Sequence, residues 1–493
     1  MKKYDYIIIG SGSGLMVLEA ALSYGKKCAL IESSKLGGTC LTKGCIPSKM
    51  LVYPADLIRE TQDSSQIGLS YSKPQVDWDL ISKRVWEQID YNKNIEESLK
   101  RTSNVDLYKG YGEFIDDHTL RVKYADGSYS EELIGENIVI SVGARTNIPP
   151  IEGLEQAAYV TAESFFGPKY PKKIYNRLAI LGAGAIGTEF AHIFSALGSK
   201  VTLIEALPRI LSLEEPEVSQ VVENQLTQDG IDIKKASLAK KVTLNGDTKV
   251  LHLEKSDGST ELVECDEIFI ATGVKSNGDL LKIENTSLDI NMKNYIITNE
   301  QMETNVEHIY AIGDINGKFQ FRHTANKEAE ILVHNLFIDS KNKKSVNYHA
   351  VPWAVFTHPQ VAHVGMTEEE VKNCTDSYKV GYNHYSDIVA GISMGFSEES
   401  DVNGFVKLIV GPNKSILGAS IVGPNASVLI QPYVYLMNCN QKCDQKPRRK
   451  QKVEFDSARM MCPHLGTYTP MDDSMVIHPA MSELTAWVTE SLE

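Results

Sequence analysis

Two segments of the chain repeat one local pattern, and this repeat constrains the fold more than any other feature of the sequence. Each segment runs from a short apolar stretch through a glycine-rich turn and a helical stretch to a second apolar stretch that ends in an acidic residue. The first contains Gly10, Gly12, Gly14 and Glu32, and the second contains Gly182, Gly184, Gly187 and Glu205. An acidic residue about 20 positions after such a turn can bind a ribose diol. Each segment is therefore predicted to be a dinucleotide-binding βαβ unit.

The two copies differ in their third glycine. The second copy has the full G-x-G-x-x-G pattern, whereas Leu15 occupies the third glycine position of the first copy and Gly14 lies one place earlier. The third glycine normally permits close packing of the helix on the strand, so we expect the first copy to make that contact differently. A nucleotide site is still predicted there, because Glu32 keeps its spacing and an anion can lie at the helix N-terminus.

Composition excludes several other functions. The 493 residues predict about three domains. With 50 Lys and Arg against 64 Asp and Glu, the formal charge of −14 would repel a phosphate backbone, so nucleic acid is not an expected partner. The sequence has no apolar run of about 18 residues and no signal peptide before the strand-like stretch 6–9. A cytoplasmic protein without a membrane partner is expected.

Cys40 and Cys45 form a close pair directly after the first unit. On a regular helix, residues five apart are separated by a rise of about 7.5 Å, which is too far for a disulfide, so a bridge would need an irregular backbone. Gly44 permits that irregularity, and a helix that begins near Cys45 would lower the pKa of its thiol. Two inert buried thiols are the alternative. The position beside a nucleotide site favours a reversible dithiol.

Two nucleotide sites imply two cofactors, and electron transfer between a nicotinamide and a flavin is the simplest chemistry for them. A strand-like stretch ends in Gly313 and Asp314, where ligands of open α/β sheets bind. Near the end of the sequence, Glu483 follows His478 by five residues. A carboxylate bonded to one imidazole nitrogen can make the other nitrogen a base. Either motif alone is also compatible with an ordinary turn.

The stretches 38–40 and 45–49 (GTC and CIPSK), with AIGD at 311–314, FTHP at 356–359 and the pair His478-Pro479, resemble the pyridine nucleotide-disulfide oxidoreductases over nearly the whole chain. The resemblance implies an α/β fold with two Rossmann-like domains, for FAD and NAD, and a C-terminal α+β dimerisation domain. The expected bounds are 1–150 for the first part of the FAD domain, 151–276 for the NAD domain, 277–345 for the second, central part of the FAD domain and 346–493 for the dimerisation domain.

The same resemblance implies roles for individual residues. FAD would contact Gly10, Gly12, Gly14, Glu32 and Asp314, NAD would contact Gly182, Gly184, Gly187 and Glu205, and Gly143, Gly273, Gly313 and Lys49 complete the cofactor-binding set. Cys45 would face the flavin, and Cys40 would exchange with substrate. Lys49 would pair with Glu189 beside the flavin ring, although a plain helix-surface position is the alternative for Glu189. His478 would be the acid/base, supplied by the partner subunit of a homodimer and oriented by Glu483.

The sequence constrains the substrate less than it constrains the cofactors. Glu205 would repel a 2′-phosphate, which favours NAD over NADP and hence a dihydrolipoyl dehydrogenase that acts on a small dithiol or a lipoyl domain. The stretches 12–14 and 323–326 resemble the mycothione reductase branch more closely, so a reductase of low-molecular-weight disulfides is the alternative. A flavin-only NADH oxidase or transhydrogenase and a non-catalytic scaffold subunit also remain open.

Two stretches depart from the family pattern. The stretch 274–277 lacks the usual Arg and Pro, so the domain junction is expected to be tied differently. An insertion near 439–465 precedes His478 and contains Cys439, Cys443, Cys462 and His464. These could bind zinc, but their spacing is unusual, and a charged surface insertion without metal is the favoured interpretation.

Overall fold

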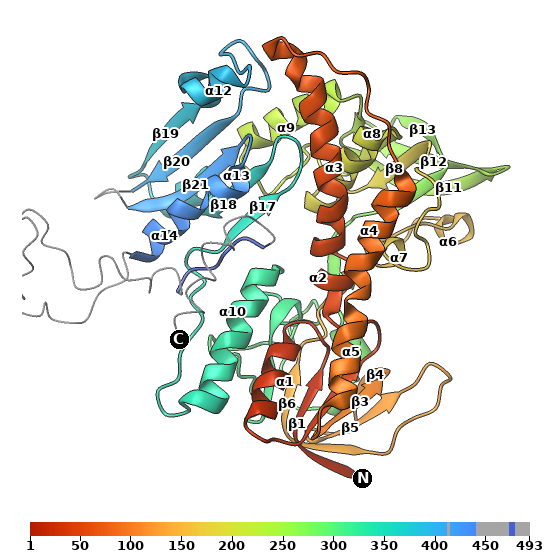
Figure 1. Cartoon of the computed structure of the whole chain (residues 1–493), viewed down its shortest axis with the longest axis vertical. Helices are drawn as coiled ribbons and strands as arrows, with labels where there is room; N and C mark the ends of the chain where they lie inside the picture. Colours follow the sequence, from red (N-terminus) through yellow and green to blue (C-terminus); the bar gives the residue numbers. More distant parts are fainter. Residues whose placement is uncertain (412–414, 440–472, 479–493) are drawn as a thin grey trace, which may run out of the picture.

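The computed structural model describes residues 1–411, 415–439 and 473–478. Figure 1 shows three regions, each built around its own sheet, with a long helix running from the first region toward the other two. Two of these sheets contain parallel strands joined by helices, and the third is antiparallel. The predicted α/β class with a separate C-terminal α+β unit is confirmed. The expected domain boundaries stay predictions.

The first sheet carries the first glycine-rich turn. Its parallel strands lie in the order β3, β2, β1, β6 and β16, and β5 and β4 extend the sheet beyond β6 in antiparallel pairing. Their bounds are β1 Lys2–Ile9, β2 Cys28–Glu32, β3 Val105–Lys109, β4 Tyr111–Phe114, β5 Thr119–Lys123, β6 Leu133–Ile140 and β16 Ile309–Ala311. Alternate residues of β1 enter two different apolar clusters, Ile8 with helices α1 (Gly14–Ser23) and α10 (Arg322–Val333) and Ile7 with β4 and β5. Burial of both faces explains the continuous apolar run.

The second sheet repeats this arrangement on a smaller scale. Four parallel strands lie in the order β10, β9, β8 and β14, with helices on one face and a three-stranded antiparallel sheet on the other. The bounds are β8 Arg177–Leu181, α8 Ala185–Leu197, β9 Lys200–Ile204, α9 Pro216–Gln228, β10 Asp232–Lys234, β11 Ser237–Asn245, β12 Thr248–Lys255, β13 Thr260–Cys265 and β14 Glu267–Ile270. The repeat predicted from sequence is thus a repeat in structure.

A short antiparallel ribbon joins the first two regions. It consists of β7 (Ala144–Thr146) and β15 (Val274–Ser276). Arg145 donates hydrogen bonds to the Ser276 carbonyl at 2.9 Å and to Asp279 Oδ2 at 2.6 Å. An arginine of β7 therefore holds the junction, and the stretch 274–277 contains no arginine.

The third region is an antiparallel sheet in the order β17, β18, β21, β20 and β19. Its elements are β17 Pro352–Val355, β18 Val361–Gly365, α11 Glu368–Cys374, β19 Lys379–His384, α12 Val389–Ser393, β20 Phe405–Val410, β21 Ile416–Val422, α13 Ala426–Leu429 and α14 Gln431–Cys439. Lys407 of β20 is buried, and its ammonium lies 3.0 Å from Glu215 Oε2 and 2.8 Å from Glu368 Oε2. This ion cluster joins the third region to the second.

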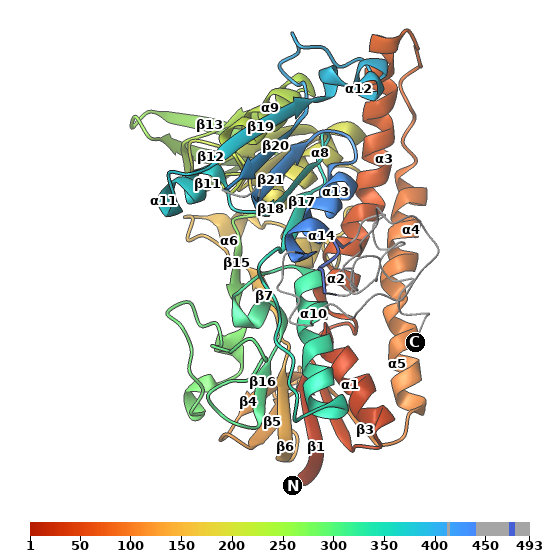
Figure 2. The same cartoon turned by 90° about the vertical axis from the view of Figure 1, so that its left-hand side faces the viewer.

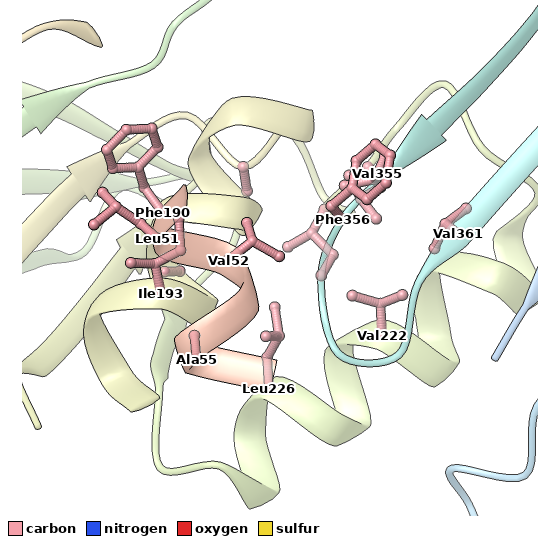
Figure 3. Packing of buried hydrophobic residues seen from close by; sticks show 14 of the residues in the cluster. Leu51, Val52, Ala55, Phe190, Ile193, Val222, Leu226, Val355, Phe356 and Val361 are labelled. Atoms are coloured by element: carbon pink, nitrogen blue, oxygen red, sulfur yellow. The ribbon is translucent and has the colours of Figure 1, made fainter. Parts of the chain in front are cut away.

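One long helix connects the site to all three regions. Helix α3 (Cys45–Asp63) leaves the first region beside the short helix α2 (Gly38–Thr42) and runs along α4 (Trp78–Asp90) (Figure 2). Figure 3 shows Leu51, Val52 and Ala55 of α3 packed among side chains of α8, α9 and the β17–β18 hairpin. Burial of these side chains fixes α3, and hence its first residue, relative to the second and third regions. No helix in the described ranges is long and apolar enough to cross a membrane.

Candidate active site

Both glycine-rich turns have the geometry that a pyrophosphate needs. Gly10 and Gly182 each follow the central strand of their sheet with φ near +100°, a conformation that favours glycine. A Cβ added at Gly12 would meet nothing closer than 4.0 Å, and one added at Gly184 nothing within 4 Å, so open space lies over both turns. The backbone there can approach a bound anion closely, at the N-terminus of α1 or α8.

Gly14 and Gly187 both permit a close approach at the start of their helices, but to different atoms. An added Cβ at Gly187 would collide with the Gly182 carbonyl, whereas one at Gly14 would collide with the Ser141 hydroxyl. That hydroxyl donates a hydrogen bond to the Gly10 carbonyl at 2.8 Å. In the first copy, the contact that Gly187 makes in the second is therefore replaced by the side chain of Ser141, which directly follows β6 and bonds to the turn. The sequence pattern did not reveal this contact.

The two acidic residues occupy equivalent positions. Glu32 Oε2 accepts the Ser11 N–H at 2.9 Å, and Glu205 Oε2 accepts the Ala183 N–H at 2.6 Å. Each carboxylate thus lies at the carboxyl end of the second strand of its unit, against its own glycine-rich turn. This is the placement that permits bonding to a ribose diol.

Asp314 lies at the same edge of the first sheet, after β16. Burial raises the pKa of its carboxyl to about 6. A Cβ added to the preceding Gly313 would lie 3.5 Å from the Ser13 hydroxyl, so this stretch rests on the glycine-rich turn. Glu328 of α10, which the sequence did not single out, fixes it by accepting the Gly313 N–H at 2.5 Å. The open turn, Glu32 and Asp314 together fit a bound FAD.

The backbone just before the cysteine pair packs closely against the first glycine-rich turn. Gly38 begins α2, and an added Cβ there would lie 2.6 Å from the Gly12 Cα. Cys40 lies in α2 and Cys45 is the first residue of α3, with Gly44 at φ −137° and ψ −113°, neither helical nor extended, between the two helices. The predicted break in the helix and the predicted helix start at Cys45 are both present.

The surroundings of Cys45 favour its thiolate. A hydrogen bond with Cys40 lowers the pKa of the Cys45 thiol below its ordinary value, and the positive charges of Lys49, His478 and Arg322 lower it further, against the effect of burial. A thiolate is the reactive form in thiol-disulfide exchange and electron donation. These surroundings favour the predicted reactive dithiol over two inert thiols, and the redox role of the pair stays a prediction.

Lys49 and Glu189 form the ion pair that the resemblance implied. Lys49 lies one turn along α3 from Cys45, and its ammonium is 2.7 Å from Glu189 Oε2 on α8. The other oxygen of Glu189 accepts the Phe356 N–H at 2.9 Å, and the Lys49 ammonium lies 4.3 Å from the centre of the Phe356 ring. Both charged side chains are largely buried, so Glu189 is not a plain helix-surface residue.

His478 reaches the cysteine pair across the whole length of the sequence. Its Nε2 lies 3.3 Å from Cys40 Sγ. Residues 473–478 contact α10 and α14. The expectation that the partner subunit supplies this histidine stays a prediction. Glu483, Cys443, Cys462 and His464 lie outside the described residues, as does the Cys439 side chain, so their expected roles stay predictions.

Gly143 and Gly273 lie directly before the two strands of the ribbon that joins the two units, and not in a glycine-rich turn. Both have positive φ, and the Gly273 carbonyl accepts the Asn147 N–H at 2.9 Å. They follow β6 and β14, at the carboxyl ends of the two parallel sheets, so a role in cofactor binding stays a prediction. Arg322, at the start of α10, was missed from sequence; its charge acts on both Cys45 and Asp314.

Comparison with known proteins agrees with this geometry. Residues 4–329 match the family model described as pyridine nucleotide-disulphide oxidoreductase, and residues 351–448 match the dimerisation domain of the same family. The chain therefore belongs to the pyridine nucleotide-disulfide oxidoreductases. This family uses FAD and NAD(P)H, and its members are flavoprotein disulfide oxidoreductases.

Relatives of several specificities have similar identity to the chain. Mercuric reductase of Lysinibacillus sphaericus is 33% identical over 87% of this chain and 76% of that protein. Mycothione reductase of Mycobacterium tuberculosis is 32% identical over 89% and 93%, and dihydrolipoyl dehydrogenase of Bacillus subtilis is 31% identical over 87% and 90%. Among solved structures, the Cu(II) complex of the HOCl-induced flavoprotein disulfide reductase RclA from Escherichia coli superimposes with a TM-score of 0.77 at 27% identity and covers all of both chains.

Proposed function

We propose that the chain is an NAD(H)-dependent dihydrolipoyl dehydrogenase, which oxidises dihydrolipoamide or a lipoyl domain through the Cys40 and Cys45 pair. The observation that carries the choice of nicotinamide is the position of Glu205. Glu205 directly follows β9, and its carboxylate accepts the N–H groups of Ala183 and Leu207 at 2.6 and 2.9 Å. A ribose diol can donate to this carboxylate, whereas a 2′-phosphate would be repelled.

The basic residues that follow Glu205 are engaged elsewhere. Arg209 donates to the Ser212 carbonyl at 2.8 Å, and Lys235 lies 2.6 Å from Glu223. For a 2′-phosphate to bind here, one of these cations would have to leave its partner. The negative charge of Glu205 would still repel the phosphate. Both considerations support NAD(H) over NADP(H).

The thiol chemistry follows from the positions of three side chains. In the oxidised enzyme, a substrate thiolate attacks Cys40 Sγ, the Cys40–Cys45 disulfide breaks, and Cys45 leaves as the thiolate that its surroundings stabilise. The second substrate thiolate then displaces Cys40 from the mixed disulfide. The substrate loses two electrons as its disulfide forms, and the cysteine pair gains them. His478, at 3.3 Å from Cys40 Sγ, holds the proton removed from the substrate thiol.

The cofactors would complete the electron path. FAD held by the first unit and NAD held by the second would supply two-electron carriers on the Cys45 side of the pair. Lys49 would hold a positive charge beside the flavin, and Glu189 would keep that ammonium in place through its bond to α8.

A mycothione reductase-like activity is the second candidate. Two observations support it. The chain aligns with 93% of the length of the mycothione reductase, and stretches 12–14 and 323–326 resemble that branch of the family. His323 and Thr324 of the second stretch begin α10 next to residues 473–478, so they lie close to the thiol-exchange site. Such an enzyme would use the same residues in the reductive direction.

Steady-state rates with matched substrates test the proposal. FAD-loaded protein would be assayed with dihydrolipoamide and NAD+, and in reverse with lipoamide, glutathione disulfide or mycothione and either NADH or NADPH. The proposal predicts fastest turnover with the lipoamide couple and NAD(H). Faster turnover of mycothione would establish the second candidate, and turnover confined to NADPH would contradict the role of Glu205. A protein that takes up no FAD would be the scaffold subunit, and full NADH oxidation by Cys40→Ser would indicate a flavin-only enzyme.

A further inference from the structure

Arg322, the first residue of α10, extends its side chain to the first glycine-rich turn. A Cβ added at Gly12, the second glycine of that turn, would lie 4.0 Å from Arg322 Nη1. We infer that the Arg322 guanidinium binds the pyrophosphate of FAD over this turn. The inference rests on the part of the proposed function in which the first unit binds FAD, and it adds a contact that the family resemblance did not imply.

The residues on either side of Arg322 are held by contacts away from the turn. The rings of Phe321 and His323 are stacked with their centroids 5.3 Å apart, and Phe321 also stacks with Trp353 of β17 at 6.2 Å. His323 Nε2 donates a hydrogen bond to the Pro352 carbonyl at 2.8 Å. These contacts hold the start of α10 against β17, and the Arg322 side chain between them extends to the turn instead.

The guanidinium has no acceptor of its own. Among the described residues, Arg322 has neither a hydrogen-bond acceptor nor an ion-pair partner, although it is half-buried. The carboxylates at this edge of the sheet are engaged elsewhere, because Glu32 accepts two backbone N–H groups and Glu328 accepts the Gly313 N–H. A guanidinium keeps its charge and carries five N–H donors. A half-buried one without a partner is therefore suited to an anionic ligand.

The charges at this edge of the sheet also favour a cation beside the phosphates. Glu32 and Asp314 bring two carboxyl groups to the FAD site, and a pyrophosphate would add further negative charge. Burial raises the pKa of the Asp314 carboxyl, and the charge of Arg322 opposes that effect. Arginine can donate two parallel N–H bonds to phosphate oxygens, and the backbone N–H groups at the start of α1 can supply others. Arg322 would thus offset the negative charge that FAD brings to the turn.

Binding of FAD to flavin-free protein tests the inference without turnover. The dissociation constant is measured from the fluorescence of unbound flavin for wild type, Arg322→Met, Arg322→Lys and Arg101→Met. Arg101 ends α5 (Asn92–Arg101) with its side chain 81% exposed, so Arg101→Met is the matched control. We expect Arg322→Met to weaken FAD binding about 10- to 100-fold, as loss of a charged hydrogen-bond donor does. Arg322→Lys should lose less, because it keeps the charge, and the control should lose nothing.

Salt and stability distinguish a charge effect from a change of shape. Raising KCl from about 50 to about 300 mM should weaken FAD binding to wild type more than to Arg322→Met, because salt screens an attraction that only wild type has. Melting temperatures of the flavin-free proteins are measured alongside, with Arg322→Gln as a second neutral variant.

Three results would overturn the inference. They are wild-type affinity in Arg322→Met, equal losses in Arg322→Lys and Arg322→Met, and a loss of affinity that follows a lower melting temperature in both neutral variants. Each of them would leave FAD binding by wild type, and hence the proposed function, intact. A wild-type protein that takes up no FAD would instead contradict the proposed function and the inference with it.

Discussion

The Lys49 ammonium lies 2.7 Å from Glu189 Oε2, and this ion pair joins the helix that begins at Cys45 to the first helix of the second dinucleotide unit. Glu189 also accepts the Phe356 N–H from the third region. The pair is largely buried, so its charges interact more strongly than an exposed pair would. One side-chain contact thus sets the position of a cation relative to the dithiol and to all three regions.

Removal of this cation should slow electron transfer. Lys49→Met is expected to lower the rate of flavin reduction by NADH about 10- to 100-fold, because a positive charge near the flavin is lost. The measurement is stopped-flow absorbance under anaerobic conditions. Lys93→Met is the matched control, because Lys93 forms an exposed ion pair with Asp90 at the same 2.7 Å distance. Equal rates in the two variants would contradict a role of Lys49 at the flavin.

Each cysteine of the pair should be essential for dithiol turnover but not for flavin chemistry. Cys40→Ser and Cys45→Ser are expected to lose lipoamide reduction while retaining NADH-dependent reduction of an artificial electron acceptor. Cys374→Ser is the control, because Cys374 is exposed and lies in the third region. Lipoamide reduction that survives either of the first two substitutions would show that the thiols do not carry the electrons.

The nicotinamide preference should depend on one carboxylate. Glu205→Ala is expected to lower kcat/KM for NADH by about 10-fold, the equivalent of a charge-assisted hydrogen bond lost from the ribose diol, and to leave kcat/KM for NADPH equal or higher. The exposed Glu264, which pairs with Arg177, provides the control variant Glu264→Ala. A parallel loss with both nucleotides would indicate that Glu205 only supports the turn.

A buried carboxyl should make stability depend on pH. Burial raises the pKa of Glu214 from 4.5 to about 7, although Trp353 Nε1 donates a hydrogen bond to it at 2.6 Å. Because the folded pKa is the higher one, ionisation opposes folding. The resulting loss of folding stability is absent below pH 4.5, grows between pH 4.5 and 7, and is complete above pH 7.

Glu214→Gln should therefore raise the melting temperature relative to wild type more at pH 8 than at pH 5. The expected difference in free energy of unfolding is on the order of 1–3 kcal/mol. Differential scanning fluorimetry between pH 5 and pH 8 measures the melting temperatures of both proteins. The matched control is Glu303→Gln, because the pKa of that carboxyl is lowered rather than raised. A gain that is independent of pH would indicate a packing effect in place of titration.

The sequence predicted those parts of the site that depend on short-range pattern. Gly10, Gly182 and Glu205 lie where a βαβ unit places them, because strand, turn and helix are local structures. The helix start at Cys45 also followed from local residues, since Gly44 permits the break between the two helices.

Contacts between distant parts of the chain could not be predicted in the same way. The Ser141 bridge to the first turn depends on a hydroxyl more than a hundred residues away, and nothing in the local pattern at Ser141 indicates it. In the sequence, Glu214 is one of several acidic residues in a polar stretch. Its burial is evident only from its contact with Trp353 in the folded chain. The position of His478 depends on where Met475 and Ile477 are buried, and that burial exists only in the folded chain.

The central claim is that Cys40 and Cys45 form a redox-active pair in electronic contact with the flavin. Anaerobic titration of FAD-loaded protein with NADH tests it most directly, with absorbance of the flavin and free-thiol counts followed together. The account predicts that wild type takes up two electrons into the disulfide before the flavin is fully reduced, and that Cys45→Ser takes up only those needed by the flavin. Identical uptake by the two proteins, with no new thiols in wild type, would contradict it.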